Sequence, residues 1–194
     1  ATLTATVLIS ALLAGCASLA PKATAPVGVD MGTAPTDAGP PADDSLNATV
    51  WFQTSVERDL VYRAIYRAAG VQLPAALADK TWDALPREDR SNDVRTLPPA
   101  IIVDVDETVL DNSPSQVRQI REQRGYDDVN WDAWVNERKA KALPGAAEFL
   151  SAAARQGVTV YYISNRTADQ AQASIDNLRA TGLPLKDTSQ FLGL

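Results

Sequence analysis

Two carboxylates, Asp104 and Asp106, are the residues whose types and spacing point most directly to chemistry. They follow an apolar, β-favouring run at 100–103 without polar alternation, which predicts a parallel strand buried on both faces. Ligands and catalytic groups collect at the carboxyl ends of strands in open α/β sheets, and side chains two apart on a strand point to the same side. Without a partner the two carboxylates would then repel each other, and one of them would take a proton. A divalent cation beside Asp104 would keep the Asp104 carboxylate ionised. The alternative is an ordinary pair of solvated turn carboxylates.

The composition narrows this chemistry further. The sequence has no histidine and one cysteine, Cys16, so Ser/His/Asp triads, thiol nucleophiles in the core and His-built zinc sites are excluded within it. Carboxylates, hydroxyls, amides and a hard metal ion remain. The net charge of −6, without a stripe of Lys and Arg, argues against a nucleic-acid polymer as a partner. A small anionic substrate would need a local cation.

The elements that must position the two carboxylates follow from periodicity, proline and glycine. Helices are expected over 48–69, with Gly70 as the stop, and over 74–85, 114–123, 131–140 and 144–156. A loop is expected over 86–99, a second buried strand over 158–163, and a helix from a capping box at Thr167 and Gln170 to about Gly182. This order of strand, helices, strand and helix predicts an α/β domain with a parallel sheet.

The N-terminal part has the pattern of an exported, anchored protein. A short apolar run at 7–13, too short to span a bilayer, precedes Leu-Ala-Gly-Cys at 13–16, which resembles the lipobox of bacterial lipoproteins. We therefore expect a signal peptide over 1–16, a lipid on Cys16 that enters a bilayer, and a disordered Ala/Pro-rich tether over 17–47. Ala17 favours sorting to the outer membrane, facing the periplasm or the surface. The alternative is an apolar N-terminal helix that ends in a core cysteine.

Two longer motifs carry a family resemblance. The sequence DVDETVLDNS at 104–113 closely resembles the first motif of the haloacid-dehalogenase-like (HAD) superfamily, and more narrowly that of the class C, or non-specific, bacterial acid phosphatases of subfamily IIIB. The sequence YYISNR at 161–166 is similar to the second motif of that family. The resemblance covers residues 48–194 and implies a HAD-like Rossmannoid parallel sheet flanked by helices.

The resemblance also implies roles for the two carboxylates. Asp104 would attack phosphorus to form an aspartyl-phosphate, and Asp106 would protonate the leaving oxygen and later activate water. Mg²⁺ would be held by the Asp104 carboxylate and the Asp106 backbone carbonyl. Thr108 would support the loop, with an ordinary turn threonine as the alternative.

Further site residues come from the second motif and from a predicted helix. Ser164, Asn165 and Arg166 would bind the phosphate, although Arg166 has an alternative role as an ion-pair partner of Asp169. Trp131 would stack on the base of a nucleotide substrate, with core packing as its alternative. For Trp134 we expect core packing, and for Asp111 and Asn112 a role in ordering the loop.

Two later motifs of the family, a lysine and an acidic pair, are not found in the sequence. We therefore expect a chain truncated at both ends, which lacks the C-terminal part of the domain and is inactive by itself. For the parent protein we predict a phosphomonoesterase, an acid phosphatase with 5′-nucleotidase activity as one option. The alternative is a non-catalytic lipoprotein with a decayed HAD-like binding module. Assembly is left open, with a homodimer as one option.

Overall fold

The computed structural model describes residues 43–91 and 93–194. The predicted signal peptide, the predicted lipidation site at Cys16 and nearly all of the predicted tether lie outside these residues. Within the described part of the chain, no helix combines the length and the apolar character needed to cross a membrane.

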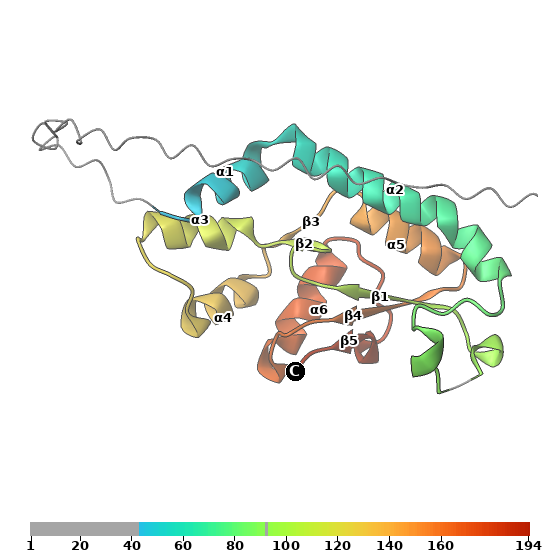
Figure 1. Cartoon of the computed structure of the whole chain (residues 1–194). Helices are drawn as coiled ribbons and strands as arrows, with labels where there is room; N and C mark the ends of the chain where they lie inside the picture. Colours follow the sequence, from blue (N-terminus) through green and yellow to red (C-terminus); the bar gives the residue numbers. More distant parts are fainter. Residues whose placement is uncertain (1–42, 92) are drawn as a thin grey trace, which may run out of the picture. The chain divides into compact units, whose positions relative to one another are not determined.

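The described chain is built from helices and short strands (Figure 1). The α-helices are α1 (Leu46–Thr54), α2 (Val56–Ala78), α3 (Ser113–Arg121), α4 (Asp128–Glu137), α5 (Ala146–Arg155) and α6 (Ala171–Ala180). The strands are β1 (Ala100–Asp104), β2 (Leu110–Asp111), β3 (Lys141–Ala142), β4 (Thr159–Ile163) and β5 (Phe191–Leu192). Short 3₁₀ helices lie at Arg87–Asp89, Val94–Thr96, Ala168–Gln170 and Thr188–Gln190.

The main sheet has the strand order β1-β4-β5, and both pairs of neighbours are parallel. In its register Asp104 lies opposite Ile163, and Ile163 lies opposite Leu192, so the carboxyl ends of all three strands meet at one edge. Strands β2 and β3 form a separate antiparallel pair. The parallel sheet with its flanking helices confirms the predicted α/β fold.

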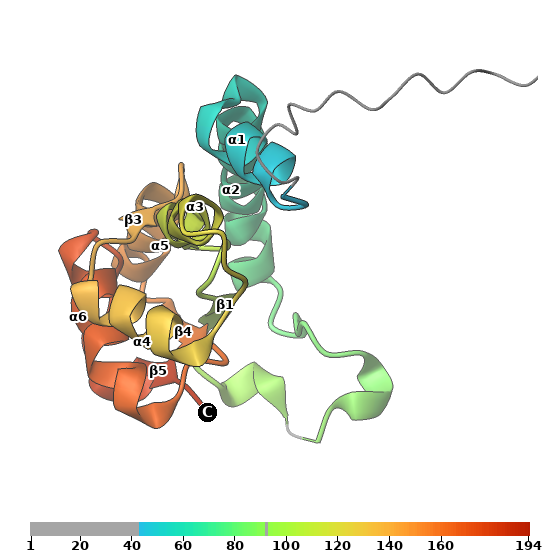
Figure 2. The same ribbon diagram turned by 90° about the vertical axis from the view of Figure 1, so that its left-hand side faces the viewer.

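Helices α5 and α6 cover one face of this sheet (Figure 2). Leu150 of α5 and Leu178 of α6 belong to the same buried cluster as Val160 and Tyr162 of β4. This follows from the topology, because β1→β4 and β4→β5 step across the sheet in the same direction. Right-handed crossovers in one direction place their helices on the same face.

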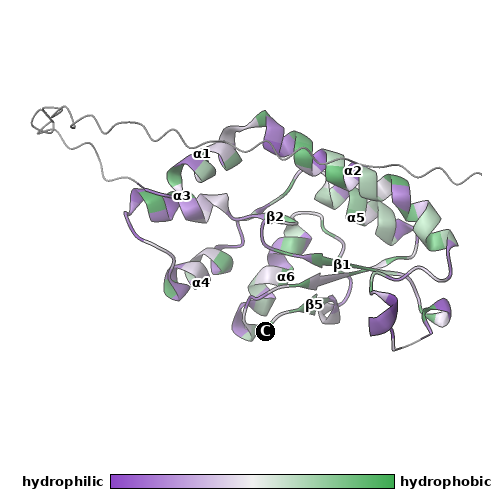
Figure 3. Ribbon diagram, in the orientation of Figure 1, coloured by the Kyte–Doolittle hydropathy of each residue, from purple (hydrophilic) through white to green (hydrophobic). Residues whose placement is uncertain are grey.

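The opposite face of the sheet corrects the prediction that both faces of the first strand are buried. Ile102 of β1 is 67% exposed, Ile163 of β4 is 44% exposed and Leu192 of β5 is 47% exposed. The apolar run that predicted double burial is plain in Figure 3, where β1 is coloured as strongly hydrophobic. Helices α5 and α6 both lie on the other face, and Ile102 lines an open hollow of about 350 Å³ with residues of α2 and of the 80–99 segment. The side chains of the apolar sheet face (Ile102, Ile163 and Leu192) therefore stay partly open to solvent.

The N-terminal helices differ most from their prediction. Helix α2 runs through Gly70 and Pro74 to Ala78, so the predicted stop at Gly70 and the separate helix over 74–85 are both wrong. A proline removes one helical hydrogen bond, and packing can offset that loss. A Cβ added at Gly70 would lie 3.7 Å from the Phe149 ring, an ordinary contact distance, so α2 packs against α5 at this position and glycine does not interrupt it.

The remaining helices lie near their predicted positions, with ends shifted by a few residues. Helix α1 begins at Leu46, inside the predicted tether, and the predicted loop over 86–99 contains two 3₁₀ turns. Helix α4 begins at Asp128 because the Asp127 side chain accepts a hydrogen bond from the Asn130 backbone N–H. The capping box of Thr167 and Gln170 is confirmed, although its first turn is 3₁₀.

Candidate active site

The turn that follows β1 is fixed by two buried valines. The side chains of Val105 and Val109 are fully buried, and the Val105 carbonyl accepts hydrogen bonds of 3.0 Å from both the Val109 and the Leu110 backbone N–H groups. Between them Glu107 adopts a left-handed backbone with φ 54°. Since both valines point into the core, the Asp104 and Asp106 carboxylates lie outside it, with Asp104 exposed and Asp106 partly buried.

Two tyrosines of α2 hold the backbone of the same turn. The Tyr62 hydroxyl donates to the Glu107 carbonyl at 2.5 Å, and the Tyr66 hydroxyl donates to the Thr108 carbonyl at 2.6 Å. Burial raises the pKa of Tyr66 to about 12, and burial followed by the charge of Glu107 raises the pKa of Tyr62. These residues were missed in the sequence, where their spacing of four shows only that they share a helix face.

Asp104 is exposed at the end of β1. Its Oδ2 accepts a hydrogen bond of 2.8 Å from the Thr108 hydroxyl, the one donor to this carboxylate among the described residues. Thr108 therefore orients the carboxylate and leaves its other oxygen open. This geometry suits an attacking group, because a nucleophile needs an accessible lone pair.

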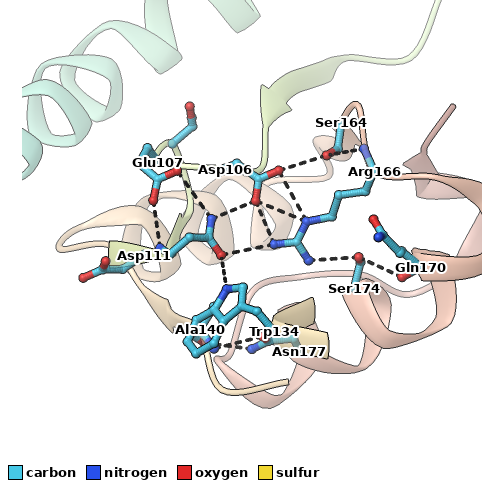
Figure 4. Close-up of polar contacts among 12 residues, drawn as sticks. Asp106, Glu107, Asp111, Trp134, Ala140, Ser164, Arg166, Gln170, Ser174 and Asn177 are labelled. Atoms are coloured by element: carbon cyan, nitrogen blue, oxygen red, sulfur yellow. Dashed lines mark hydrogen bonds and ion pairs between the residues drawn. The ribbon is translucent and has the colours of Figure 1, made fainter. Parts of the chain in front are cut away.

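Asp106, in contrast, is surrounded by donors (Figure 4). Its Oδ1 accepts from Arg166 Nη2 at 2.7 Å and from Asn112 Nδ2 at 2.8 Å. Its Oδ2 accepts from the Ser164 hydroxyl at 3.2 Å, and Arg166 Nε lies 3.2 and 3.3 Å from the two oxygens. The alternative considered for Arg166, an ion pair with Asp169, is wrong, because the guanidinium reaches Asp106 and Asp169 instead accepts from Thr167. The carboxylate is thus held in one orientation.

The groups behind Asp106 are themselves hydrogen bonded. Trp134 Nε1 donates to Asn112 Oδ1 at 2.9 Å, which directs the Asn112 amide nitrogen toward Asp106. Arg166 Nη1 donates to the Ser174 hydroxyl at 3.0 Å. Trp134 is buried as predicted, but its indole N–H also orders the site. Asn112 donates further to Glu107, whose pKa is raised by burial, and so links the turn to α4.

The loop after β4 supplies the other predicted site residues. Ser164 is buried next to Asp106, and its backbone N–H donates to the Leu192 carbonyl at 3.0 Å. Asn165 is exposed. The structure therefore brings Ser164 and Arg166 together with Asp106, whereas their predicted binding of phosphate stays a prediction.

A cleft of about 310 Å³ opens beside this network. Its lining joins the acidic turn to an aromatic wall: Asp106, Glu107, Asn112, Ser115, Gln116, Gln119, Tyr126, Trp131, Asn165 and Arg166. The half-buried Trp131 ring lies 6.4 Å from the Tyr126 ring and 5.4 Å from the Arg166 guanidinium carbon, as measured to ring centroids. Trp131 also packs against the core, as one of the two alternatives for it had it, and its stacking on a nucleotide base stays a prediction.

The oxygen atoms at the end of β1 are of the type that binds a magnesium ion. The described residues contain no group of three or more acidic, His or Cys side chains able to hold a metal. Mg²⁺, however, is commonly held by one or two carboxylates together with water and substrate phosphate. The exposed Asp104 carboxylate and the Asp106 backbone carbonyl are oxygen ligands of this type.

A parallel sheet that presents two carboxylates and a serine at one edge matches the class indicated by the motifs. The chain belongs to the HAD superfamily, subfamily IIIB (acid phosphatase), whose family model matches residues 4–193. This confirms the predicted family.

Solved structures and a characterised relative agree with this assignment. The class C acid phosphatase of Bacillus anthracis is 37% identical with a TM-score of 0.65, and the alignment covers 77% of this chain and 57% of that one. The same Bacillus phosphatase with tungstate bound is 38% identical with a TM-score of 0.67 and the same coverage. Acid phosphatase 1 of Solanum lycopersicum is 30% identical over 81 residues, which are 42% of this chain and 32% of that protein. The chain thus spans little more than half the length of the solved phosphatases.

Proposed function

We propose that the protein is an acid phosphatase that hydrolyses phosphomonoesters through an aspartyl-phosphate at Asp104. The observation that carries the proposal is the difference between the two carboxylates at the end of β1. Asp104 is exposed with one oxygen open, whereas Asp106 is fixed by donors from the loop after β4. A decayed binding module would have no need to keep this pair or its supports. The non-catalytic alternative is therefore disfavoured.

The residues divide the reaction between them. An Asp104 oxygen bonds to phosphorus as the ester P–O bond breaks, and the leaving oxygen takes a proton from Asp106. Asp106 then takes a proton from water, whose oxygen attacks the aspartyl-phosphate and releases inorganic phosphate with the Asp104 carboxylate restored. The Ser164 hydroxyl, which lies 3.2 Å from Asp106, donates to a phosphate oxygen. Asn165 lines the same cleft beside it. The tungstate-bound Bacillus anthracis relative supports an oxyanion site of this kind.

Mg²⁺ is the proposed cofactor. Bound to the Asp104 carboxylate and the Asp106 backbone carbonyl, it would offset the negative charges of the phosphate and the acidic turn. Activity of the full gene product should disappear with a chelator and return with Mg²⁺. Full activity in metal-free buffer would contradict this site.

The cleft supports a nucleotide-like leaving group. The Trp131 and Tyr126 rings form an apolar wall beside the acidic turn, and aromatic side chains stack on any nucleobase. Trp131→Ala should raise KM for a nucleoside 5′-monophosphate and leave KM for glycerol 2-phosphate unchanged. Equal effects on both substrates would remove the stacking role.

The test of the main proposal is phosphate release by the full gene product, combined with chemical identification of the phosphorylated residue. Rapid quenching during turnover should give a protein with the mass of one added phosphoryl group, located on Asp104. Label on another residue would overturn the mechanism, and absence of turnover would favour the non-catalytic module.

A lipid anchor at Cys16 is a separate proposal that rests on the Leu-Ala-Gly-Cys sequence at 13–16. The lipid would hold the protein at the bacterial cell envelope, on the outer membrane where the host has one. Cys16→Ser should release the protein from the membrane fraction. Unchanged fractionation of this variant would refute the anchor.

A further inference from the structure

Arg166 is a buried cation at the floor of the cleft, and each of its guanidinium nitrogens is hydrogen bonded. Its side chain is 2% exposed, and that of Asp106 is 27% exposed. Nε and Nη2 donate to Asp106, Nη2 also donates to Asn112 Oδ1 at 3.4 Å, and Nη1 donates to Ser174. An arginine that binds an incoming phosphate needs N–H groups that are not already hydrogen bonded. In Arg166, both Nε and Nη2 already donate hydrogen bonds to the Asp106 carboxylate.

The position of Arg166 is fixed from behind as well. Ser174, which accepts from Nη1, donates its own hydroxyl proton to the Gln170 carbonyl at 2.9 Å. The Arg166 backbone N–H donates to the Ser164 hydroxyl oxygen at 3.2 Å. The Trp131 ring, which lines the cleft, covers one face of the guanidinium. Arg166 thus lies in a frame built from the β4 loop, α6 and α4.

We infer that Arg166 is a positioning residue, which holds the Asp106 carboxylate in the orientation needed to meet the leaving oxygen. An Arg–carboxylate fork has two parallel contacts and therefore fixes direction as well as distance, which a lysine point charge does not. Proton transfer depends strongly on this geometry, and a displacement of about 1 Å can cost about 10²-fold in rate. This inference rests on the proposed phosphatase function and assigns Arg166 a role other than phosphate binding.

The test compares substrates that differ in how much they need the proton. With the full gene product, Arg166→Lys and Arg166→Gln should slow phosphoenzyme formation from an alkyl phosphate by about 10²-fold, and from p-nitrophenyl phosphate by only a few-fold. Ser174→Ala removes a hydrogen-bond acceptor of Arg166 and should give a smaller effect with the same substrate dependence. Equal slowing on both substrates, together with weaker tungstate inhibition, would assign Arg166 to the phosphate and overturn the inference.

Arg58→Gln is the matched control. Arg58 is also partly buried and also pairs with an aspartate of the same segment, Asp111, at 3.1 Å, but Asp111 does not face the cleft. Its loss should lower stability without any dependence on the leaving group. A double variant, Asp106→Asn with Arg166→Gln, should show no more leaving-group dependence than Asp106→Asn alone, because the positioned group is already gone. Additive effects would refute the coupling.

A readout that does not need turnover separates this inference from the proposed function. In ¹⁵N NMR spectra the Arg166 Nε–H should exchange slowly with solvent, and Asp106→Ala should shift its signal and speed its exchange. An inactive wild-type protein with a protected Nε–H would refute the phosphatase proposal and keep the fork. Rapid exchange in the wild type would refute the fork, whatever the activity.

Discussion

The turn after β1 has an outer side and an inner side with opposite designs. On the outer side Asp104 is exposed and shares a single hydrogen bond with Thr108. On the inner side the Asp106 carboxylate accepts from Arg166, Asn112 and Ser164. A reacting oxygen must stay free, whereas a proton-transfer group must be aimed, and the two requirements are met two residues apart. Substitutions in the full gene product can remove the elements of this contrast one at a time.

Loss of the open carboxylate should have the largest effect. Asp104→Asn removes both the attacking oxygen and a charged metal ligand, so phosphate release should fall to background with every substrate and no phosphoenzyme should form. Initial rates and intact mass spectra after quenching measure both. Asp169→Asn is the control, because Asp169 is exposed and accepts from Thr167 away from the turn. Substantial residual turnover in Asp104→Asn would assign the nucleophile elsewhere.

Loss of the aimed carboxylate should have a smaller, substrate-dependent effect. Asp106→Asn keeps the nucleophile and the backbone carbonyl but removes the proton donor, a contribution of about 10²- to 10⁴-fold. Phosphoenzyme formation should suffer less with p-nitrophenyl phosphate, whose leaving group is weakly basic, than with a nucleoside 5′-phosphate. Because water activation in the second step is also impaired, the phosphoenzyme at Asp104 should accumulate. Its accumulation should be seen as a burst of leaving-group release or as a mass shift. Identical losses on both substrates would show that Asp106 is not the general acid.

The inner side can also be disturbed without touching a carboxylate. Trp134→Phe keeps the buried ring but removes the N–H that orients Asn112, so Asn112 Oδ1 keeps only the longer hydrogen bond of 3.4 Å from Arg166. Loss of the closer donor to a buried acceptor costs about 1–3 kcal/mol. Urea unfolding should show this loss of stability. Trp131→Phe serves as the control, since no hydrogen bond of the Trp131 side chain is found among the described residues. Equal stability of Trp134→Phe and the wild type would mean that the Asn112 orientation is held by Arg166 alone.

The outer side has a weaker support in Tyr66, which should give the smallest effect. Tyr66→Phe removes one hydrogen bond to the Thr108 carbonyl, at a cost of about 1 kcal/mol near neutral pH. The pKa of Tyr66 is raised from 10.0 to about 12 by folding, so the unfolded chain releases this proton first. The stabilisation is therefore complete below pH 10 and lost as the pH rises toward 12.

Urea midpoints measured across this alkaline range test the assignment. The wild type should lose stability more steeply between pH 10 and 12 than Tyr66→Phe. Parallel curves would show that the Tyr66 hydroxyl is not responsible. Tyr126→Phe is a comparison from outside the turn: burial and a hydrogen bond with Asp128 also raise the pKa of Tyr126, but without the large shift of Tyr66, so this change should alter the alkaline slope less.

The sequence predicted the site better than it predicted the supports of the site. Asp104 and Asp106 could be placed together because side chains two apart at the end of a strand point to the same side, and the family resemblance added Ser164 from the end of the neighbouring strand. The fork from Arg166 to Asp106 spans 60 residues. It was missed because Asp169 offered a nearer partner, and local spacing carries no information about which distant acid lies closer in the fold.

The errors in the fold have the same origin. Gly70 and Pro74 were predicted to interrupt the chain on their intrinsic propensities, whereas packing of α2 against α5 lets one helix run through both. The uniformly apolar run at 100–103 predicted burial on both faces. This prediction failed at Ile102 because the hydrophobicity of a strand does not show which elements pack against each of its faces. Helices with caps, such as that begun by Thr167, were placed well because a cap is a local signal.

The apolar sheet face should affect the solubility and self-association of the protein. Strand β1 lies at an edge of the sheet and, in the described chain, pairs with β4 alone. The backbone N–H and C=O groups on its other edge therefore lie next to the exposed apolar side chains of the sheet face. Such edges invite strand addition and precipitation unless something covers them. Residues 43–194 produced alone should bind a hydrophobic dye and form larger species as the concentration rises. Ile102→Lys changes an exposed side chain of β1 and should increase the yield of soluble protein, while the turn with Asp104 and Asp106 stays unchanged.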